Sequence, residues 1–228
     1  MKTLLGLRVA LFVICLGPFA QLVYNAFTDN LGANPIDAIT RHTGSWTLIF
    51  LLVTLSVTPL RKISGWNALV KFRRMLGLFA FFYAVLHFTT FLVLDHFFDF
   101  NAIIKDVTKR PYVTAGFTGF VLLVPLAITS TTGMIRRLGK KWQQLHRLVY
   151  VAAAAGVLHF YWLVKADIRR PVQYGLVLAL VLGYRLYANA KTALGRHSPR
   201  SSLAGGSDSS RSTLPGSRSS VPARPDSA

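Results

Sequence analysis

The sequence has little cysteine, few acidic side chains and no nucleotide-binding glycine loop. Cys15 is the single cysteine among 228 residues. This excludes an internal disulfide, a cysteine-ligated iron–sulfur cluster and covalent haem attachment through a C-x-x-C-H motif. Without a phosphate-cradling glycine loop or a Rossmann-like extension, the chain is not expected to oxidise NAD(P)H by itself. Any metal must therefore be held by other ligands, and histidine is the obvious supply.

Long apolar runs, by contrast, dominate the chain. Hydrophobic residues make up 52% of it, and the mean hydropathy is +0.43. Six runs have roughly the 17–25 residues that a membrane-spanning helix requires. We therefore expect an all-α integral membrane protein, a bundle of six transmembrane helices within residues 1–194. The runs cover residues 7–27, 44–60, 75–95, 113–130, 148–164 and 172–190.

The first of these runs begins like a secretory signal peptide, with Lys2 and Arg8 before an apolar stretch. The apolar run continues past the expected cleavage region, and no clear small-x-small site follows it. We therefore expect a retained helix.

Basic residues outnumber acidic ones by 26 to 8, and their placement predicts the topology. Lys and Arg cluster in 61–74, in 136–147 and after Tyr184, whereas the connections at 28–43 and 95–112 are mixed. Positive residues mark the cytoplasmic loops of membrane proteins. We therefore expect both termini and both basic loops in the cytoplasm, where anionic lipid favours positive charge, and no nucleic-acid partner.

The C-terminal segment 195–228 changes to Ser, Pro, Arg and Gly. So few apolar side chains cannot offset the entropy of ordering, which predicts a disordered cytoplasmic tail.

Two histidines, His87 and His159, lie deep inside separate apolar runs. Each is about twelve residues from a basic flank, or about 18 Å at the helical rise, beyond the membrane midplane. Placing an imidazole in the hydrocarbon of a membrane costs free energy, so such a residue indicates a functional site. Two at matching depth predict axial ligands of one haem iron, and such a bis-histidine site favours electron transfer. The alternative is two unrelated histidines hydrogen-bonded to neighbouring helices.

His146 lies thirteen residues before His159, about 20 Å along the helix, so the two cannot bind the same iron. It could ligate a second haem or hydrogen-bond a propionate or a quinone. Arg73 and Arg74 occupy the matching position before His87. They could pair with a haem propionate or a flavin phosphate, or simply anchor the helix at the cytoplasmic boundary. The interfacial His42 and His96, and His197 in the tail, are weaker candidates.

The motifs that contain these residues resemble the ferric-reductase-like transmembrane domain. With the segments around the second run, the chain resembles more narrowly the haem-binding membrane subunits of bacterial methionine-sulfoxide reductase systems, over residues 5–190. The motifs are Arg73-Arg74-x-Leu76-Gly77-Leu78 with Tyr83 and His87, Trp142-x-x-Leu145-His146-Arg147-Leu148-x-Tyr150, His159-Phe160-x-Trp162, Thr43-Gly44-x-Trp46 and Thr58-Pro59-Leu60-Arg61.

The resemblance implies a b-type cytochrome of the bacterial inner membrane, an electron-transfer subunit without a complete catalytic site of its own. It would receive electrons from the quinone pool or a cytoplasmic flavin reductase. It would pass them to a periplasmic molybdopterin-containing reductase that repairs oxidised methionine in proteins.

The resemblance also implies FMN binding, His87 and His159 as the axial haem ligands, and His146 as a further haem-associated histidine. Relatives with two haems carry a second histidine where this chain has Arg73 and Arg74, so one haem b is expected here.

Two functions of other classes remain open from the sequence. One is a stand-alone transmembrane ferric or metal reductase that needs no protein partner. The other is a non-redox transporter whose histidines relay protons. A transporter would be colourless, whereas a bis-histidine cytochrome has a reducible Soret band.

Overall fold

The computed structural model describes residues 2–164 and 167–196, and every regular element within them is a helix. This confirms the predicted all-α class. Of the predicted disordered tail, only Gly195 and Arg196 fall within the described residues, at the end of a helix; the rest lies outside them. The six predicted runs correspond to α1 (Lys2–Phe27), α2 (Pro35–Ser64), α3 (Val70–Thr89) with the π-helix η2 (Thr90–Asp95), α5 (Pro111–Ile128), α8 (Leu148–Leu163) and α9 (Arg169–Arg196). Shorter elements connect them: the 3-10 helix η1 (Asn67–Leu69), α4 (Phe100–Lys109), α6 (Thr132–Leu138) and α7 (Lys140–Leu145).

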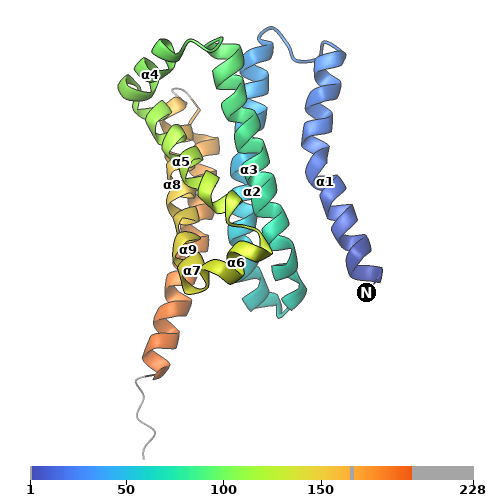
Figure 1. Cartoon of the computed structure of the whole chain (residues 1–228), viewed down its shortest axis with the longest axis vertical. Coiled ribbons are helices and arrows are strands. Elements are labelled where there is room, and N and C mark those ends of the chain that lie inside the picture. Colours follow the sequence, from blue (N-terminus) through green and yellow to red (C-terminus); the bar gives the residue numbers. More distant parts are fainter. Residues whose placement is uncertain (1, 165–166, 197–228) are drawn as a thin grey trace, which may run out of the picture. The chain divides into compact units, whose positions relative to one another are not determined.

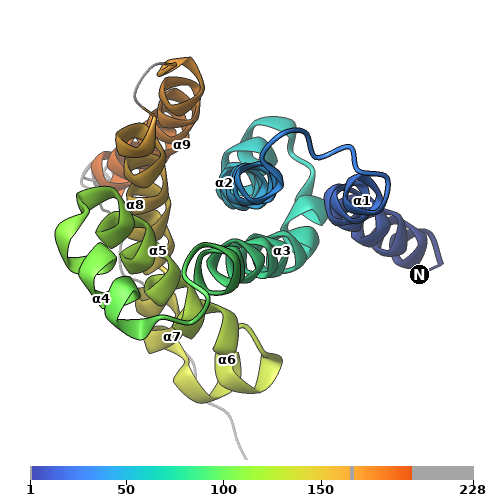
Figure 2. The same cartoon turned by 90° about the horizontal axis from the view of Figure 1, so that it is seen from above.

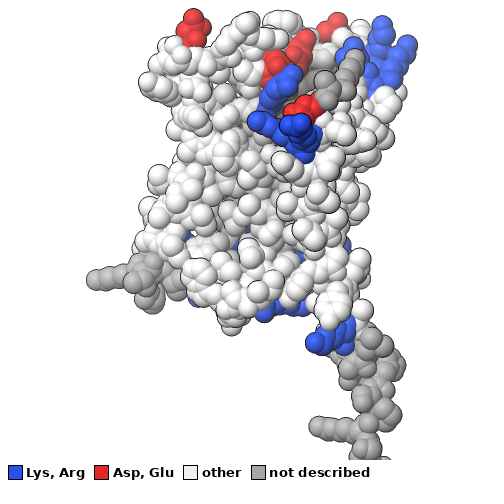
Figure 3. Space-filling view, turned by 180° about the vertical axis from the view of Figure 1, so that it is seen from behind, with Lys and Arg blue, Asp and Glu red and all other residues white. Residues whose placement is uncertain are grey.

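Four helical segments are long and apolar enough to cross a membrane: Leu5–Phe27, Pro35–Ser64, Asn67–Asp95 and Pro111–Ile128. They coincide with the first four predicted runs. Large apolar side chains on the outside of the helices are exposed, for example Ile14 at 68% and Leu180 at 72%. Between its two ends, the surface in Figure 3 consists almost entirely of uncharged side chains. A lipid-facing surface explains such an exposed apolar band.

Local sequence signals set where the helices begin and end. Asn34 caps α2 by accepting a hydrogen bond from the Asp37 backbone N–H, with Pro35 in the first turn. Gly65 ends the helix in the left-handed conformation, with φ of 71°. Asp99 caps α4 in the same way as Asn34 caps α2. The helix α2 therefore starts nine residues before the predicted apolar run, because a capped polar segment precedes it.

The two ends of the bundle differ in charge. The connections after α1, α3 and α8 meet at one end, and those after α2 and α5 meet at the other (Figure 1). We call the first the mixed end, because it carries acidic and basic residues, and the second the basic end. The acidic residues of the described chain belong to the mixed end: Asp29, Asp37, Asp95, Asp99, Asp106 and Asp167.

Two antiparallel helix pairs form the centre of the bundle. The helices α2 and α3 pack along each other, as do α5 and α8, and the pairs meet through α3 with α5 and α2 with α8 (Figure 2). The helix α1 contacts the α2/α3 pair, and Leu178 and Val181 of α9 join the core. The histidines of α3 and α8 are thus carried by different pairs.

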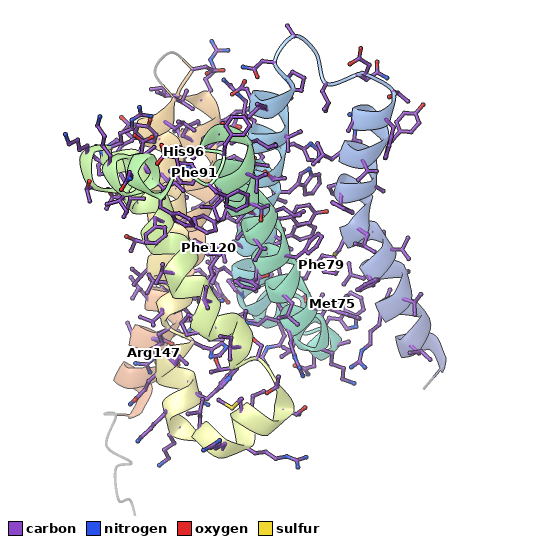
Figure 4. All side chains as sticks on the ribbon, turned by 45° about the horizontal axis from the view of Figure 1, so that its top comes forward. Met75, Phe79, Phe91, His96, Phe120 and Arg147 are labelled. Atoms are coloured by element: carbon purple, nitrogen blue, oxygen red, sulfur yellow. The ribbon has the colours of Figure 1, made fainter. Side chains whose placement is uncertain are left out.

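A tyrosine of α3 fastens α1 to the bundle. Pro18 lies inside α1 and lacks a backbone N–H. Beside it, the Tyr83 hydroxyl accepts from Phe19 N at 3.0 Å and donates to Cys15 O at 2.9 Å. The hydroxyl is therefore inserted into the helical hydrogen-bond ladder of α1. Figure 4 shows Met75 and Phe79 on the same side of α3, toward α1.

Candidate functional site

His87 and His159, the two histidines predicted from the sequence, meet in the interior. His87 belongs to the last turn of α3 and His159 to α8; their ring centres are 6.1 Å apart and their planes 71° apart. A metal–imidazole bond is about 2 Å long and the ring centre lies about 1 Å behind the nitrogen, so two imidazoles on one metal have centres about 6 Å apart. The observed separation matches that requirement.

The hydrogen bonds of the two rings leave the same nitrogen available on each. Nδ1 of His87 lies 3.0 Å from Thr40 O in α2, and Nδ1 of His159 lies 2.7 Å from Tyr112 O in α5. A carbonyl can only accept, so each Nδ1 carries the proton and each Nε2 carries a lone pair. Histidines that bind metals are typically oriented by such a bond from their second nitrogen.

Each imidazole also rests against a glycine of the neighbouring helix. A Cβ added to Gly44 would lie 3.0 Å from Cε1 of His87, and one added to Gly116 would lie 2.7 Å from Nδ1 of His159. No real Cβ fits at the second distance without movement of the ring. These glycines therefore allow each imidazole to approach the backbone closely enough to reach its carbonyl.

We call each imidazole with its orienting carbonyl and its adjacent glycine a cradle, and the two cradles have the same arrangement. The carbonyl that orients the imidazole precedes the glycine by four residues in both, Thr40 before Gly44 and Tyr112 before Gly116. Four residues are about one helical turn, so carbonyl and glycine lie on the same face of their helix. The α2/α3 and α5/α8 pairs thus present matching histidines from opposite sides.

The donor set fits a haem. Among residues 2–164 and 167–196, no three histidine, cysteine, aspartate or glutamate side chains converge to hold a metal ion. The two imidazoles can serve as an axial pair, and the remaining ligands must come from a cofactor. A haem supplies four in-plane nitrogens and accepts axial imidazoles. His87 and His159, with Nδ1 of each ring bound to a carbonyl and ring centres 6.1 Å apart, are the residues that would hold it.

The end of α3 is shaped by the π-helix η2, which directly follows the turn that carries His87. Thr90 at its start is buried and donates to His87 O at 2.7 Å. Thr43 of α2 is also buried, with Oγ1 3.4 Å from His87 Nδ1. A π-turn in a helix frequently marks a functional site, and here it lies beside a ligand candidate.

His146 lies near the basic end, apart from the histidine pair. Its Nδ1 is 3.1 Å from Trp142 O, and its ring stacks on Trp142 with centres 3.9 Å apart. Its Nε2 is buried without a hydrogen-bond partner in the described chain, although Leu126 O is near. Burial lowers the pKa of His146, and the charge of Arg73 lowers it further. The carbonyls of Trp142 and Leu126 raise this pKa, but by less. His146 is therefore neutral at pH 7, with an available lone pair.

The structure separates the two arginines of α3. Arg73 is half-buried and lies within electrostatic range of His146, Arg185 and Tyr150. Arg74 is exposed. The structure therefore brings Arg73 and His146 together and leaves Arg74 on the surface.

The remaining interfacial histidines have structural partners. His42 Nε2 is 2.9 Å from Pro18 O in α1. His96 packs against Phe91 at the mixed end, with the ring planes tilted by 50° (Figure 4). Its Nε2 lies 3.1 Å from Asp106 Oδ2, and that oxygen also pairs with Arg110 at 3.1 Å. These contacts join α1 to α2 and η2 to α4.

Sequence reasoning missed the orienting carbonyls of Thr40 and Tyr112, since any residue supplies a carbonyl. It also gave Arg185 no role, although this is the single charged residue of the sixth apolar run. A lone arginine in such a run was the available signal.

Comparison with known proteins gives consistent similarities. Residues 43–157 match the family described as ferric reductase like transmembrane component. The chain is 56% identical over 205 residues to the protein-methionine-sulfoxide reductase heme-binding subunit MsrQ of Herminiimonas arsenicoxydans, covering 89% of this chain and 92% of that protein. It is 48% identical over 189 residues to MsrQ of Ralstonia nicotianae (82% and 87%) and 52% identical over 180 residues to MsrQ of Rhodospirillum rubrum (78% and 86%). No solved structure matches the chain.

Proposed function

This chain belongs to the ferric-reductase-like transmembrane family and, within it, to the MsrQ haem-binding subunits of protein-methionine-sulfoxide reductases, and we propose that it is the b-type cytochrome of such a system. In this proposal it carries electrons across the bacterial inner membrane to a partner reductase. The observation that carries the proposal is the facing pair His87 and His159, with both Nδ1 atoms bound to carbonyls and both Nε2 atoms available.

The proposed topology has six spans and cytoplasmic termini. Beside the four segments of spanning length, α8 packs along α5 and contributes His159, and α9 follows it back toward the basic end. Placing the basic end in the cytoplasm agrees with the positive-inside rule. The mixed end and the histidine pair then lie toward the periplasm.

The chain's own residues fix the geometry of the proposed cofactor site. Thr40 and Tyr112 hold the imidazole tautomers, and Gly44 and Gly116 provide the close approach. Haem b bound by the pair would supply one-electron chemistry. With both imidazoles as protein ligands, the iron would have no open coordination position, which would favour electron transfer over reaction with oxygen.

The electron donor is proposed to act at the basic end, as quinol from the quinone pool or as a flavin reduced by a cytoplasmic reductase. Arg73, Arg74 and His146 lie there and offer positive charge and one unsatisfied imidazole nitrogen. They are the proposed contacts for FMN, quinone or a haem-associated group. The electron acceptor is proposed to be a periplasmic molybdopterin-containing, MsrP-like reductase at the mixed end.

The test is to purify the full-length protein in detergent and record its visible spectrum. We expect a Soret band that shifts on reduction, and faster reoxidation of the reduced haem when a periplasmic methionine-sulfoxide reductase is added with its substrate. A colourless protein would reject the cytochrome assignment. The protein could instead bind haem and reduce ferric iron at a rate equal to its electron transfer to any protein partner. That result would favour a stand-alone metal reductase.

A further inference from the structure

The two buried side-chain nitrogens that lack a hydrogen-bond partner in the described chain belong to His146 and Arg185. Both residues lie toward the basic end, and both act electrostatically on Arg73 or are acted on by it. Buried polar atoms without partners are rare and each needs an explanation. Two in one region indicate a site that a further group completes.

Arg185 points into the bundle and not toward the lipid headgroups. Its guanidinium donates to Leu55 O of α2 at 2.6 Å and to the Tyr150 hydroxyl of α8, and it lies over the Tyr150 ring, 5.2 Å from its centre. Leu55 is completely buried. An arginine that only anchored a helix end would extend its head to water. Here the head is held inside, with Nε–H unused.

The charge of this region is uncompensated. Arg73 has no hydrogen bond or ion pair within the described residues, and it lies close enough to Arg185 for their charges to repel. The acidic residues of the described chain belong to the mixed end, at the opposite end of the helices. A buried charge is costly unless it is paired. An anion from outside the described chain would therefore stabilise these two partly buried arginines.

We propose that Arg185, Arg73 and the Tyr150 hydroxyl form a partly buried anion site in the basic half of the bundle, which takes the oxyanion of a cofactor bound within the bundle. Arg185 offers Nε–H, Arg73 offers its whole guanidinium, and Tyr150 keeps a hydroxyl hydrogen because its oxygen accepts from Arg185. Arginine suits carboxylate and phosphate oxygens because its planar donors match their geometry. The oxyanion is a porphyrin carboxylate or a flavin phosphate, and the inference rests on the proposed cytochrome function.

The test compares ligands that differ only in the anion, using full-length protein in detergent. One arm measures binding of FMN and of riboflavin, which lacks the phosphate. The other arm reconstitutes haem-depleted protein with haem and with haem dimethyl ester, which lacks the carboxylates. The variants are Arg185→Gln, Arg73→Gln and, as a control, Arg147→Gln. Arg147 is exposed, carries the same charge and directly follows His146.

Hydrogen bonds to a charged group are worth enough for a preference of about tenfold or more. We expect the wild type and Arg147→Gln to prefer FMN over riboflavin, or haem over its ester, by that factor. Arg185→Gln and Arg73→Gln should reduce the ratio toward one. The arm in which this happens identifies the phosphate or the carboxylate as the anion.

The inference is overturned if both ratios are the same in all four proteins. Arg73→Gln breaks no hydrogen bond of the described chain, so it answers the question even if Arg185→Gln fails to fold. A normal Soret band with unchanged ratios rejects the anion site alone. A wild-type protein without a Soret band rejects the proposed function instead.

Discussion

The α2/α3 and α5/α8 helix pairs are alike near the mixed end and different near the basic end. Near the mixed end, each pair carries one histidine, one orienting carbonyl and one glycine at the same spacing. Thirteen or fourteen residues before the two histidines, the first pair has Arg73 and Arg74 in α3, whereas the second has His146 just before α8. Near the mixed end, the imidazoles have hydrogen-bond partners for Nδ1 and leave only their Nε2 atoms available. Near the basic end, the arginines leave uncompensated positive charge.

This difference distinguishes two kinds of site. A symmetric pair of neutral imidazoles suits a metal that brings its own equatorial ligands. An asymmetric set of arginines and one neutral histidine needs an anion. The same bundle therefore offers a metal ligand set at one depth and an anion site at another. This comparison can be tested by substituting the residues that the two helix pairs share and the residues at which they differ.

The largest effect is expected from removing either matched ligand. His87→Ala and His159→Ala should each abolish haem binding, because a single axial imidazole cannot hold the group in a site built for two. The absorbance ratio of the Soret band to protein measures the loss. His96→Gln, which alters the histidine that directly follows η2 and bonds Asp106, is the control and should retain the band. Full haem retention in either alanine variant contradicts the assignment.

The next effect should come from the glycines, and it should be unequal. Gly116→Ala places a Cβ 2.7 Å from the His159 ring, whereas Gly44→Ala places one 3.0 Å from the His87 ring. Displacing an orienting contact typically weakens metal binding by about ten- to hundredfold. We expect Gly116→Ala to weaken haem binding by that amount and Gly44→Ala by less.

Titration of haem into the depleted variants gives the two affinities. As a control, Gly133→Ala should bind haem like the wild type, because nothing lies within 4 Å of an added Cβ there. A wild-type affinity in Gly116→Ala would show that the His159 ring is not held as tightly as this contact indicates.

A smaller effect concerns the pH dependence of stability and His146, which lies near the basic end where the two helix pairs differ. The pKa of His146 is lower in the folded protein than its ordinary value of 6.5. The unfolded chain therefore binds more protons, and stability falls as the pH drops through about 6.5 toward the folded pKa. His146→Gln removes this contribution.

Thermal unfolding in detergent between pH 5 and pH 7.5 provides the measurement, with haem loaded so that the axial pair does not titrate. The wild type should lose more stability on acidification than His146→Gln. An identical pH dependence in the two proteins would mean that His146 is not neutral in the folded state.

The smallest effect tests one of the local differences between the cradles, the residue that precedes each glycine. Thr43 precedes Gly44, whereas Ala115 precedes Gly116. The Thr43 hydroxyl lies 2.8 Å from Ile39 O and 3.1 Å from Thr40 O, so its single hydrogen is divided between the two carbonyls and takes up part of the one that orients His87.

Thr43→Ala makes the two cradles alike at this position and leaves that carbonyl to His87 alone. Haem should be retained. A stronger bond from Nδ1 makes the ligand more basic, so the reduction potential should fall slightly, by on the order of 10 mV against the about 59 mV of a tenfold one-electron change. Potentiometric titration measures it, and a rise in potential contradicts the shared carbonyl.

Much of this protein could be predicted from residue types alone. The apolar runs gave the helices and their order because hydropathy over a span-length window is a local property. His87 and His159 could be selected because an imidazole inside such a run is unusual. The start of α2 was missed because its first turn is polar and depends on the Asn34 cap.

The sequence by itself thus determined the helical class, the segregation of acidic residues to alternate connections and the two ligand candidates. Only the tertiary structure decided that their rings lie 6.1 Å apart, that carbonyls of Thr40 and Tyr112 fix them, and that Arg185 turns inward beside Arg73. The physical reason is that backbone carbonyls and close glycine contacts have no residue-type signal. The direction of a long side chain is likewise set by the helices packed around it.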